Sequence, residues 1–474
     1  MNFDVRQLIG GHWQKGARTE NLRDKYTGEV VGRVHCADGA QVDAAVSGVD
    51  RAQSAGPLAP PERQRILAEA SRLVDERREE LIAGMVCEAG FTRADASGEV
   101  NRAIETLRLS GEEAVRLVGD MVPMEGAPGG LGRIGFTMRV PVGVVCAITP
   151  FNSPLNTVAH KVGPAIAAGN SVVLKPSLQT PATAEGLVDI LLTAGMPAER
   201  IALVHGPGET VGPWLLDDPR IRFYTFTGST AVGEAISRGA GLRRTQLELG
   251  SLSSTVICED ADLDTAVAKC VAGAYRKAGQ VCTSVQRLYV HRSVADQVTE
   301  GLLSAVAELA AGDPRDPQTS VGPLIAESEA RRVESWVRSA AASGAVVEAG
   351  GERVGSVVTP TVLTGVEPDM QVMCQEVFGP VLTLQAYEDL DAAMREINAT
   401  PYGLSAGIFT ADLGRGLRAA RELEMGSVHI NETSSSRVDL MPYGGVKASG
   451  SGKEGPRYAA REMTEERLIS ITTG

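Results

Sequence analysis

Three residues that lie far apart along the chain have side chains suited to covalent catalysis. Cys282 lies in GQVCTSVQR, with neither a histidine nor a second cysteine beside it. Glu248 closes the apolar stretch TQLELG, and Asn152 follows a strand-like run in TPFN. A thiolate is a nucleophile, a buried carboxylate can serve as a general base, and an amide can stabilise an oxyanion. Each also has a plainer interpretation: Asn152 would cap the next helix, and Glu248 would pair within a turn.

Three further positions could bind a phosphate or a ribose. Lys175 in LKPS ends a predicted strand, and Gly228 and Ser229 in FTGST join a predicted strand to a helix. A glycine permits close approach of the backbone, and a hydroxyl at a helix N-terminus can bind an anion. A solvated lysine and a helix cap are the alternatives, and the glycine-rich stretch 206–212 (GPGETVG) is by itself a weak signal.

The composition indicates a globular protein of more than one domain. The 474 residues are too many for one core, and a formal net charge of -13 without a basic cluster argues against nucleic acid and anionic membranes as partners. No apolar run approaches about 18 residues, and the first residues lack a charged-then-apolar signal pattern. Seven scattered cysteines without a CxxC pair predict free thiols, a cytoplasmic location and no metal site.

The elements that must position these residues follow from alternation. Between 142 and 250, strand-like and helix-like stretches alternate, which predicts βαβ units in a parallel, Rossmann-type sheet. Ligands of such sheets bind at the carboxyl edge, where Asn152 and Lys175 would both lie. A second alternating series from about residue 254 predicts another α/β domain. Helices are expected over 60–88 and 97–118, and the Gly- and Pro-rich segment 119–143 is expected to carry a hairpin outside the core.

Seven motifs, in this order and roughly this spacing, make the chain resemble the aldehyde dehydrogenase superfamily: TPFN, LKPS, FTGST, LELG, GQVC, EVFGP and MPYGGVKASGSG. Each motif is weak alone, but the ordered set covers nearly the whole chain. The resemblance implies an α/β fold with a Rossmann-type dinucleotide-binding domain (1–120 and 142–250) and a catalytic domain that carries the nucleophilic cysteine (251–440). A small β element (121–141 and 441–474) would join subunits into a homodimer or homotetramer.

The resemblance also assigns roles to residues. Cys282 would attack an aldehyde, Asn152 and the Cys282 backbone N–H would bind the oxyanion, and Glu248 would activate the water that hydrolyses the thioester. The presence of Glu248 argues against transfer of the acyl group to coenzyme A. The cofactor would be NAD or NADP, and its binding residues would be Phe151, Lys175, Ser177, Gly228, Ser229, Glu376 and Phe378.

The cofactor preference stays open because of one departure from the family pattern. Leu178 stands where many NAD-preferring relatives have a glutamate that binds both ribose hydroxyls. Without that carboxylate a 2′-phosphate is not repelled, so NADP remains an alternative.

The substrate end is also left open. The stretch SSSRVDLMPYGG resembles the branch of lactaldehyde, glycolaldehyde, non-phosphorylating glyceraldehyde-3-phosphate and phosphonoacetaldehyde dehydrogenases. There, Arg437 and Arg108 could clamp an anion and His160 could face the substrate. The alternatives are an Arg437–Asp439 pair and a core histidine, and Val281 stands where phosphate-binding relatives often carry arginine.

The sequence therefore predicts an NAD(P)-dependent enzyme that oxidises a small polar aldehyde to its carboxylate. Whether that aldehyde carries a phosphate, phosphonate or carboxylate is not decided. A thiol esterase or hydrolase that uses Cys282 and a non-catalytic structural protein on the same fold are the alternatives.

Overall fold

The alternation predicted for 142–250 forms a parallel sheet in the computed structural model, which describes residues 2–472. Its strands lie in the order β10-β9-β8-β11-β12, which is the order of a Rossmann sheet with its topological switch point between β8 and β11. The predicted fold class is confirmed. The strands are β8 (Val144–Ile148), β9 (Ser171–Lys175), β10 (Ile201–Leu203), β11 (Ile221–Thr227) and β12 (Arg244–Glu248).

Short antiparallel strands extend this sheet at both edges. Beyond β10 lie β2 (Gln7–Ile9) and β3 (His12–Gln14), and β24 (Gly450–Ser451) pairs with β12 so that Gly450 is opposite Glu248. The C-terminal part of the chain therefore returns to the strand that ends at the predicted general base. A separate sheet near the N-terminus contains β1 (Phe3–Val5), β4 (Arg18–Arg23) and β5 (Val30–Cys36).

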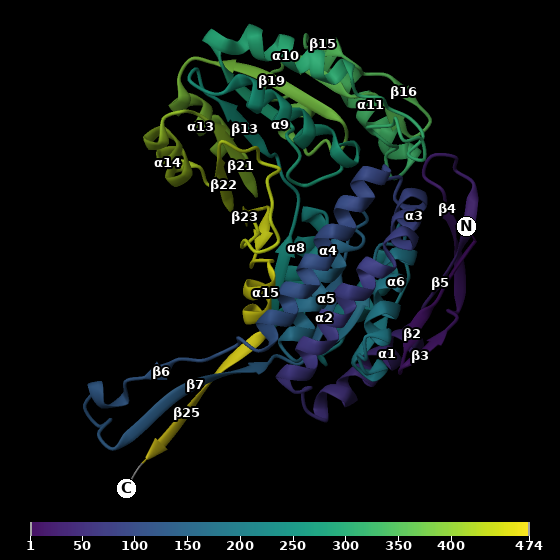
Figure 1. Ribbon diagram of the computed structural model, residues 1–474, viewed down its shortest axis with the longest axis vertical. Helices are drawn as coiled ribbons and strands as arrows, with labels where there is room; N and C mark the ends of the chain where they lie inside the picture. The colour runs from purple at the N-terminus through teal and green to yellow at the C-terminus, as the bar shows by residue number, and fades with distance from the viewer. Residues whose placement is uncertain (1, 473–474) are drawn as a thin grey trace.

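Helices cover both faces of the Rossmann sheet (Figure 1). Val145 and Ala147 of β8 pack toward one face, whereas Val144 and Cys146 pack toward the other, as the alternation of a strand buried on both sides requires. Cys146 is thus a core residue. The helices are α1 (Gly39–Ser54), α2 (Pro60–Glu76), α3 (Arg78–Glu88), α4 (Arg93–Ala114), α5 (Asn156–Ala167), α6 (Pro181–Thr193), α7 (Gly208–Asp217), α8 (Thr230–Ala240) and α15 (Pro456–Glu462).

The helix predicted over 60–88 is two helices in the structure. The chain leaves helical geometry at Arg77 (φ -93°, ψ 16°), whose guanidinium pairs with Glu80 on α3 and Asp189 on α6. The apolar period continues across this break, so the sequence pattern does not reveal it. The helix predicted over 97–118 begins earlier, at Arg93, and ends at Ala114.

A second, seven-stranded sheet lies in the upper part of Figure 1, in the order β15-β18-β19-β14-β13-β21-β22. All neighbours are parallel except β15 and β18. Its strands are β13 (Ser254–Ile257), β14 (Arg287–His291), β15 (Val346–Ala349), β18 (Thr361–Thr364), β19 (Val381–Tyr387), β21 (Ser405–Phe409) and β22 (Ser427–Ile430). Its helices are α9 (Leu263–Tyr275), α10 (Ala295–Ala307), α11 (Glu327–Ala342), α12 (Gln371–Cys374), α13 (Leu390–Asn398) and α14 (Leu413–Glu422).

The Gly- and Pro-rich excursion forms an arm that extends away from both sheets at the lower left of Figure 1. In it β7 (Arg133–Pro141) pairs antiparallel with β6 (Met121–Val122) and, over nine residues, with β25 (Thr464–Thr472). Among the described residues, none of the helices has the length and hydropathy that crossing a membrane requires.

Candidate active site

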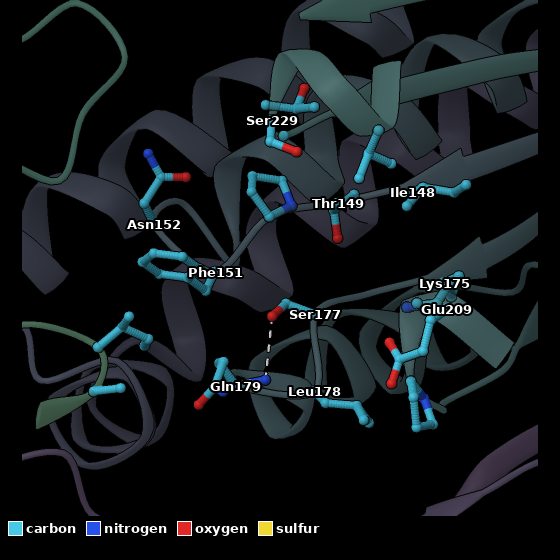
Figure 2. Close-up of a pocket in the computed structure, with 18 of the residues that line it drawn as sticks. Ile148, Thr149, Phe151, Asn152, Lys175, Ser177, Leu178, Gln179, Glu209 and Ser229 are labelled. Carbon is cyan, nitrogen blue, oxygen red and sulfur yellow. Dashed lines mark hydrogen bonds between the residues drawn. The ribbon is translucent and has the colours of Figure 1, made fainter. Parts of the chain in front are cut away.

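A cavity of about 1670 Å³ opens at the carboxyl edge of the Rossmann sheet, beside its switch point. Loops after β8, β9 and β11 line it together with residues from the second α/β part. Figure 2 shows Phe151, Ser177 and Ser229 around the same space. Most residues proposed from the sequence meet here: Phe151, Asn152, Lys175, Ser177, Gly228, Ser229, Cys282, Glu376 and Phe378 all line this cavity.

Lys175 can hold an anionic or hydroxyl-rich ligand in this cavity. Its side chain is buried, and its ammonium lies 3.4 Å from the carbonyl oxygen of Pro176, without an ion pair to any described carboxylate. Burial lowers the pKa of Lys175, and Glu209, which Figure 2 shows beside it, is one of the charges that oppose the shift. A buried ammonium so weakly partnered fits the ribose or phosphate of a dinucleotide.

Two serines offer further polar contacts to such a ligand. Ser229 occupies the N-cap position of the 11-residue helix α8, but its hydroxyl makes no capping hydrogen bond and is available at the helix N-terminus. Ser177 accepts a hydrogen bond from the Gln179 N–H at 3.1 Å (Figure 2). Leu178 lies between Ser177 and Gln179 and packs against the apolar cluster of the N-terminal sheet. The turn 177–179 therefore carries no carboxylate toward the cavity.

The end of the cavity near Cys282 is built by an aromatic pair and a carboxyl. Phe151 and Phe378 meet edge to face, with ring centroids 5.9 Å apart and an interplanar angle of 87°. Phe378 has a φ of 48°, a left-handed backbone that costs energy in a residue other than glycine and is enriched at functional sites. Glu376 accepts the Ser251 N–H at 3.1 Å, and burial raises its pKa to about 8.

The thiol of Cys282 is within hydrogen-bonding distance of one side chain. Its sulfur lies 2.9 Å from the hydroxyl of Tyr443, which is 3% exposed. Burial raises the pKa of Cys282 to about 12, the charge of Glu248 adds to that rise, and the hydrogen bond with Tyr443 opposes it. The environment therefore disfavours the thiolate, and any group that stabilises the anion matters for reactivity.

The loop that carries Cys282 has a strained backbone that fixes the position of Asn152. Lys277 and Ala278 both have left-handed φ angles, of 51° and 54°. Two residues later, the carbonyl oxygen of Gln280 accepts a hydrogen bond from the Asn152 side-chain amide at 2.8 Å. Because α5 begins well after Asn152, this residue is not a helix cap, and its second N–H remains to serve an oxyanion.

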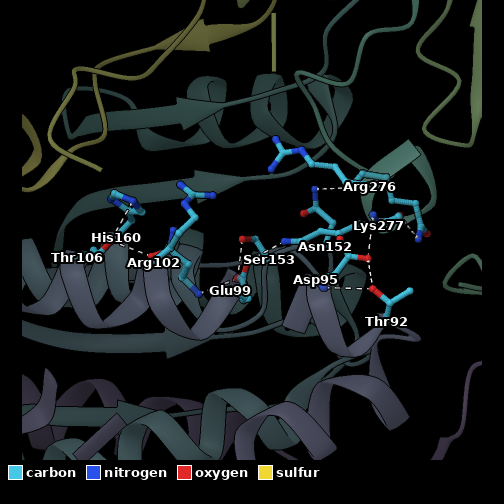
Figure 3. A network of polar contacts seen from close by, with 12 residues as sticks. Thr92, Asp95, Glu99, Arg102, Thr106, Asn152, Ser153, His160, Arg276 and Lys277 are labelled. Carbon is cyan, nitrogen blue, oxygen red and sulfur yellow. Dashed lines mark hydrogen bonds and ion pairs between the residues drawn. The ribbon is translucent and has the colours of Figure 1, made fainter. Parts of the chain in front are cut away.

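Glu99 on α4 joins the loop of Asn152 to the loop of Cys282 (Figure 3). It pairs with the Lys277 ammonium at 2.7 Å and accepts hydrogen bonds from the Ser153 hydroxyl at 2.6 Å and the Asn156 N–H at 2.8 Å. Lys277 also donates to the Asn152 carbonyl oxygen at 3.0 Å. Burial alone would raise the pKa of Glu99, but Lys277 lowers it, so the pair is ionised in the interior.

Glu248 does not line the cavity but lies buried behind Cys282. It is 2% exposed, and neither carboxylate oxygen has a partner among the described residues. Burial raises its pKa well above the usual range, and the charge of Glu454 adds to the shift. A carboxyl without a fixed partner and with an elevated pKa has the properties of a general base, not those of a carboxylate paired in a turn.

The structure pairs Arg437 with Glu454, at 3.0 Å, and not with Asp439 as one interpretation predicted. Glu454 also accepts from the Lys161 ammonium at 2.9 Å, and the Arg437 guanidinium stacks over the Tyr443 ring with its carbon 3.7 Å from the centroid. The positive charge of Arg437 is therefore already matched by Glu454, and its guanidinium also packs on Tyr443, the tyrosine beside Cys282.

His160 and Arg108 do not lie where the anion-clamp hypothesis needs them. His160 is 1% exposed and lies 2.8 Å from Asp439, so it belongs to a buried cluster (Figure 3). Arg108 is on the exposed face of α4, with 46% of its side chain accessible, and pairs with Glu105 and Glu112. The arginine of α4 that does face this region is Arg102, which pairs with Asp439 at 2.7 Å.

Arg276 is a candidate residue that sequence reasoning missed. Its guanidinium donates to the Ser435 hydroxyl at 2.8 Å, and no described carboxylate lies within salt-bridge distance. Burial lowers its pKa, and the charge of Arg102 adds to that shift, whereas the charge of Asp95 and, after it, that of a Cys282 thiolate oppose it. The sequence signal was present, because two adjacent basic residues, Arg276 and Lys277, stand just before the GQVC motif. Tyr443 likewise lies inside a motif that the sequence analysis used, MPYGGVKASGSG. Glu99 could be identified only from the structure, because its partner Lys277 is 178 residues away.

Comparisons with known proteins agree with this geometry. The family model described as "Aldehyde dehydrogenase family" matches residues 13–469. The chain is 45% identical to a 3-sulfolactaldehyde dehydrogenase of Priestia aryabhattai over 463 residues, 98% of this chain and 97% of the relative. An aldehyde dehydrogenase of Physcomitrella patens in complex with the reaction product succinate superimposes with a TM-score of 0.96 at 35% identity, covering 99% of this chain and 98% of that one.

A second solved structure is the NADP-dependent glyceraldehyde-3-phosphate dehydrogenase of Bacillus halodurans C-125 complexed with NADP. It has a TM-score of 0.96 at 34% identity and covers 100% of both chains. These matches confirm the resemblance inferred from seven motifs. The chain belongs to the aldehyde dehydrogenase family and is an oxidoreductase that oxidises small aldehydes with NAD or NADP.

Proposed function

We propose that this protein oxidises a small aldehyde with an anionic group at its far end, through a thioester on Cys282. The observation that carries the proposal is Arg276, a half-buried cation without a salt-bridge partner among the described residues, close enough to interact electrostatically with Cys282. Such a cation gains most from a substrate that supplies the missing negative charge. Three similar proteins are named for, or bind, a sulfonate, a carboxylate or a phosphate compound, which supports an anionic substrate class.

The first step is attack of the Cys282 thiolate on the aldehyde carbon, which forms a C–S bond and moves negative charge to the carbonyl oxygen. The free N–H of the Asn152 amide and the Cys282 backbone N–H would stabilise that oxyanion. The hydrogen bond from Asn152 to Gln280 fixes the amide relative to the cysteine loop, so little reorganisation is needed during the attack.

The cofactor would bind with Lys175, Ser177 and Ser229 toward its adenosine and pyrophosphate and with Glu376 and Phe378 toward its nicotinamide ribose and ring. When bound, the nicotinamide accepts the hydride that leaves the former aldehyde carbon. A thioester on Cys282 then remains, and Glu248 removes a proton from the water that attacks it, so that the carboxylate leaves and the thiolate is restored. A base in this position favours hydrolysis over acyl transfer to coenzyme A.

Replacement of the nucleophile tests this mechanism. Cys282→Ala should abolish aldehyde-dependent formation of NADH or NADPH while cofactor binding, measured by calorimetry, is retained. Turnover by the variant would contradict the mechanism. Ester hydrolysis without any nicotinamide, together with aldehydes that are inert, would instead favour the thiol hydrolase alternative.

A matched pair of substrates tests the anion site. 3-Sulfolactaldehyde and lactaldehyde differ by one sulfonate, so kcat/KM for both is measured on wild type, Arg276→Met and the exposed control Arg108→Met. Arg276→Met should lower kcat/KM for the sulfonate about 10- to 100-fold, the worth of charge-assisted hydrogen bonds, with little effect on lactaldehyde. Equal losses for both substrates would contradict an anion site at Arg276.

We also propose that the arm joins subunits into a homodimer or homotetramer. Ile134 and Met138 on β7 and Leu468 and Ile471 on β25 are 45–54% exposed, an unusual density of apolar side chains for a free surface. Leu468→Asp should lower the molar mass measured by light scattering, and an unchanged mass would contradict this role.

A cytoplasmic location is proposed because all seven cysteines are free thiols.

A further inference from the structure

We propose that the Tyr443 hydroxyl is a further catalytic group, which donates a hydrogen bond to the Cys282 sulfur and stabilises the thiolate both as nucleophile and as leaving group. The inference rests on the proposed role of Cys282 and adds a residue to it. The contact of 2.9 Å between the two atoms is short for a hydrogen bond to sulfur. The Tyr443 side chain is buried, whereas Cys282 is partly exposed where it lines the cavity.

The surrounding structure holds the tyrosine at this distance. Its backbone N–H donates to the Glu454 carbonyl oxygen at 3.1 Å, and the Glu454 N–H donates back at 2.6 Å. The Arg437 guanidinium, itself paired with Glu454, packs on the ring. A residue held by its backbone and one ring face has little freedom to turn its hydroxyl away from the sulfur.

The next residue shows how closely this segment fits between nucleophile and base. A Cβ added at Gly444 would lie 2.8 Å from a carboxylate oxygen of Glu248. The backbone at 443–444 therefore passes directly by Glu248 while the Tyr443 side chain reaches Cys282. One short segment thus contacts both reacting groups.

The direction of the hydrogen bond follows from the protonation states. Burial raises the pKa of Tyr443 well above its usual value, and a charged Cys282 raises it further, so the phenol keeps its proton at neutral pH. A thiolate has no proton to give and can only accept. When Cys282 ionises, the contact therefore becomes a charge-assisted hydrogen bond from oxygen to sulfur, without proton transfer to the sulfur.

This contact matters because other groups near Cys282 oppose the anion. Burial and the charges of Glu248 and Glu376 raise the thiol pKa, whereas the hydrogen bond with Tyr443 and, to a smaller extent, the charge of Arg437 lower it. Negative charge returns to sulfur when water has added to the thioester and the C–S bond breaks. The same donor would then assist departure of the sulfur, so loss of the hydroxyl should slow both acylation and hydrolysis.

The decisive variant is Tyr443→Phe, which keeps the ring under Arg437 and removes one oxygen atom. Alkylation of Cys282 by iodoacetamide is followed against pH by peptide mass spectrometry, with exposed Cys374 as an internal reference and Tyr458→Phe as the control variant. We expect the thiol pKa of Cys282 to rise by about one unit, so that alkylation at neutral pH falls about tenfold, with Cys374 and the control unchanged.

A second variant tests donor strength without removing the hydroxyl. Site-specific 3-fluorotyrosine at position 443 has a more acidic phenol and should make Cys282 alkylate faster at neutral pH. An unchanged alkylation profile in either variant would overturn the proposal, even if turnover falls. Alkylation needs no aldehyde, so this result is independent of the proposed function, which fails separately if Cys282→Ala still turns over.

Discussion

The two sides of Cys282 are built differently. On the cofactor side is an open cavity, whose walls are strand-end loops, glycines and the Phe151–Phe378 pair. On the other side, side chains are buried in ionic and hydrogen-bonded pairs, with Lys277 on Glu99 and Lys161 and Arg437 on Glu454. One side is a space that a ligand fills, whereas the other is a packed network of paired charges. Among the described residues of that network, Glu248 and Arg276 have no salt bridge.

This difference indicates where the enzyme is sensitive. A cavity wall tolerates change because a ligand or water can adjust to it, but a buried charge that loses its partner has no water to replace it. Substitutions in the network should therefore affect stability, proton transfer and rate strongly, whereas those in the cavity wall should mainly alter cofactor choice.

The largest effect is expected at Glu248, the unpartnered group of the network. Glu248→Gln should lower steady-state turnover by about 10²- to 10⁴-fold, the usual contribution of a general base. The first burst of reduced cofactor should persist, because removal of the nearby negative charge lowers the pKa of Cys282. Stopped-flow absorbance separates the two phases. Loss of the burst together with turnover would mean that Glu248 also acts before the thioester forms.

The next largest effect is expected at the pair that joins the Asn152 and Cys282 loops. Lys277→Met leaves Glu99 charged and buried, which should lower the free energy of unfolding by about 3–5 kcal/mol. Turnover should fall as well, since Lys277 also holds the Asn152 carbonyl. Chemical denaturation measures the stability change.

The control for the Lys277→Met prediction is an exposed ion pair on α4, the helix that carries Glu99. Glu105→Gln breaks an exposed pair with Arg108 and should change the free energy of unfolding by less than about 1 kcal/mol. Similar stability losses in Lys277→Met and Glu105→Gln would show that burial does not distinguish the two pairs and would break the comparison.

A smaller effect is expected on the pH dependence of turnover. In the proposed mechanism Glu248 would act as a base only when ionised, so hydrolysis should decline as the pH falls through its elevated pKa. Glu454 contributes to that elevation through like charge, and Glu454→Gln should lower the pKa of Glu248. The acid limb of the kcat profile should therefore move to lower pH. A limb that stays in place or moves to higher pH, in variant protein with a native circular dichroism spectrum, would assign the limb to another group.

The sequence predicted the cofactor side of Cys282 more completely than the network side. Lys175 and Ser229 follow strand ends, which can be recognised from alternation, and Glu376 lies in the EVFGP motif that the family resemblance supplied, so all three were predicted without the fold. The network depends on pairs such as Lys277 with Glu99, separated by 178 residues, and no local pattern specifies such a partner. Arg108 was proposed from helical spacing alone, whereas the arginine of α4 that faces the site in the structure is Arg102.

The smallest effect is expected in the cavity wall, at Leu178. Leu178→Glu places a carboxylate in the turn between Ser177 and Gln179, where it would repel the 2′-phosphate of NADP and bind the ribose hydroxyls of NAD. The ratio of kcat/KM for NAD to that for NADP should rise about tenfold, which corresponds to about 1.4 kcal/mol. Leu178→Gln is the matched control, since it loses the same apolar contacts with the N-terminal sheet but adds no charge. If both variants changed the ratio equally, packing of the turn and not its charge would set the preference, and the cavity wall would be as dependent on fixed partners as the network behind Cys282.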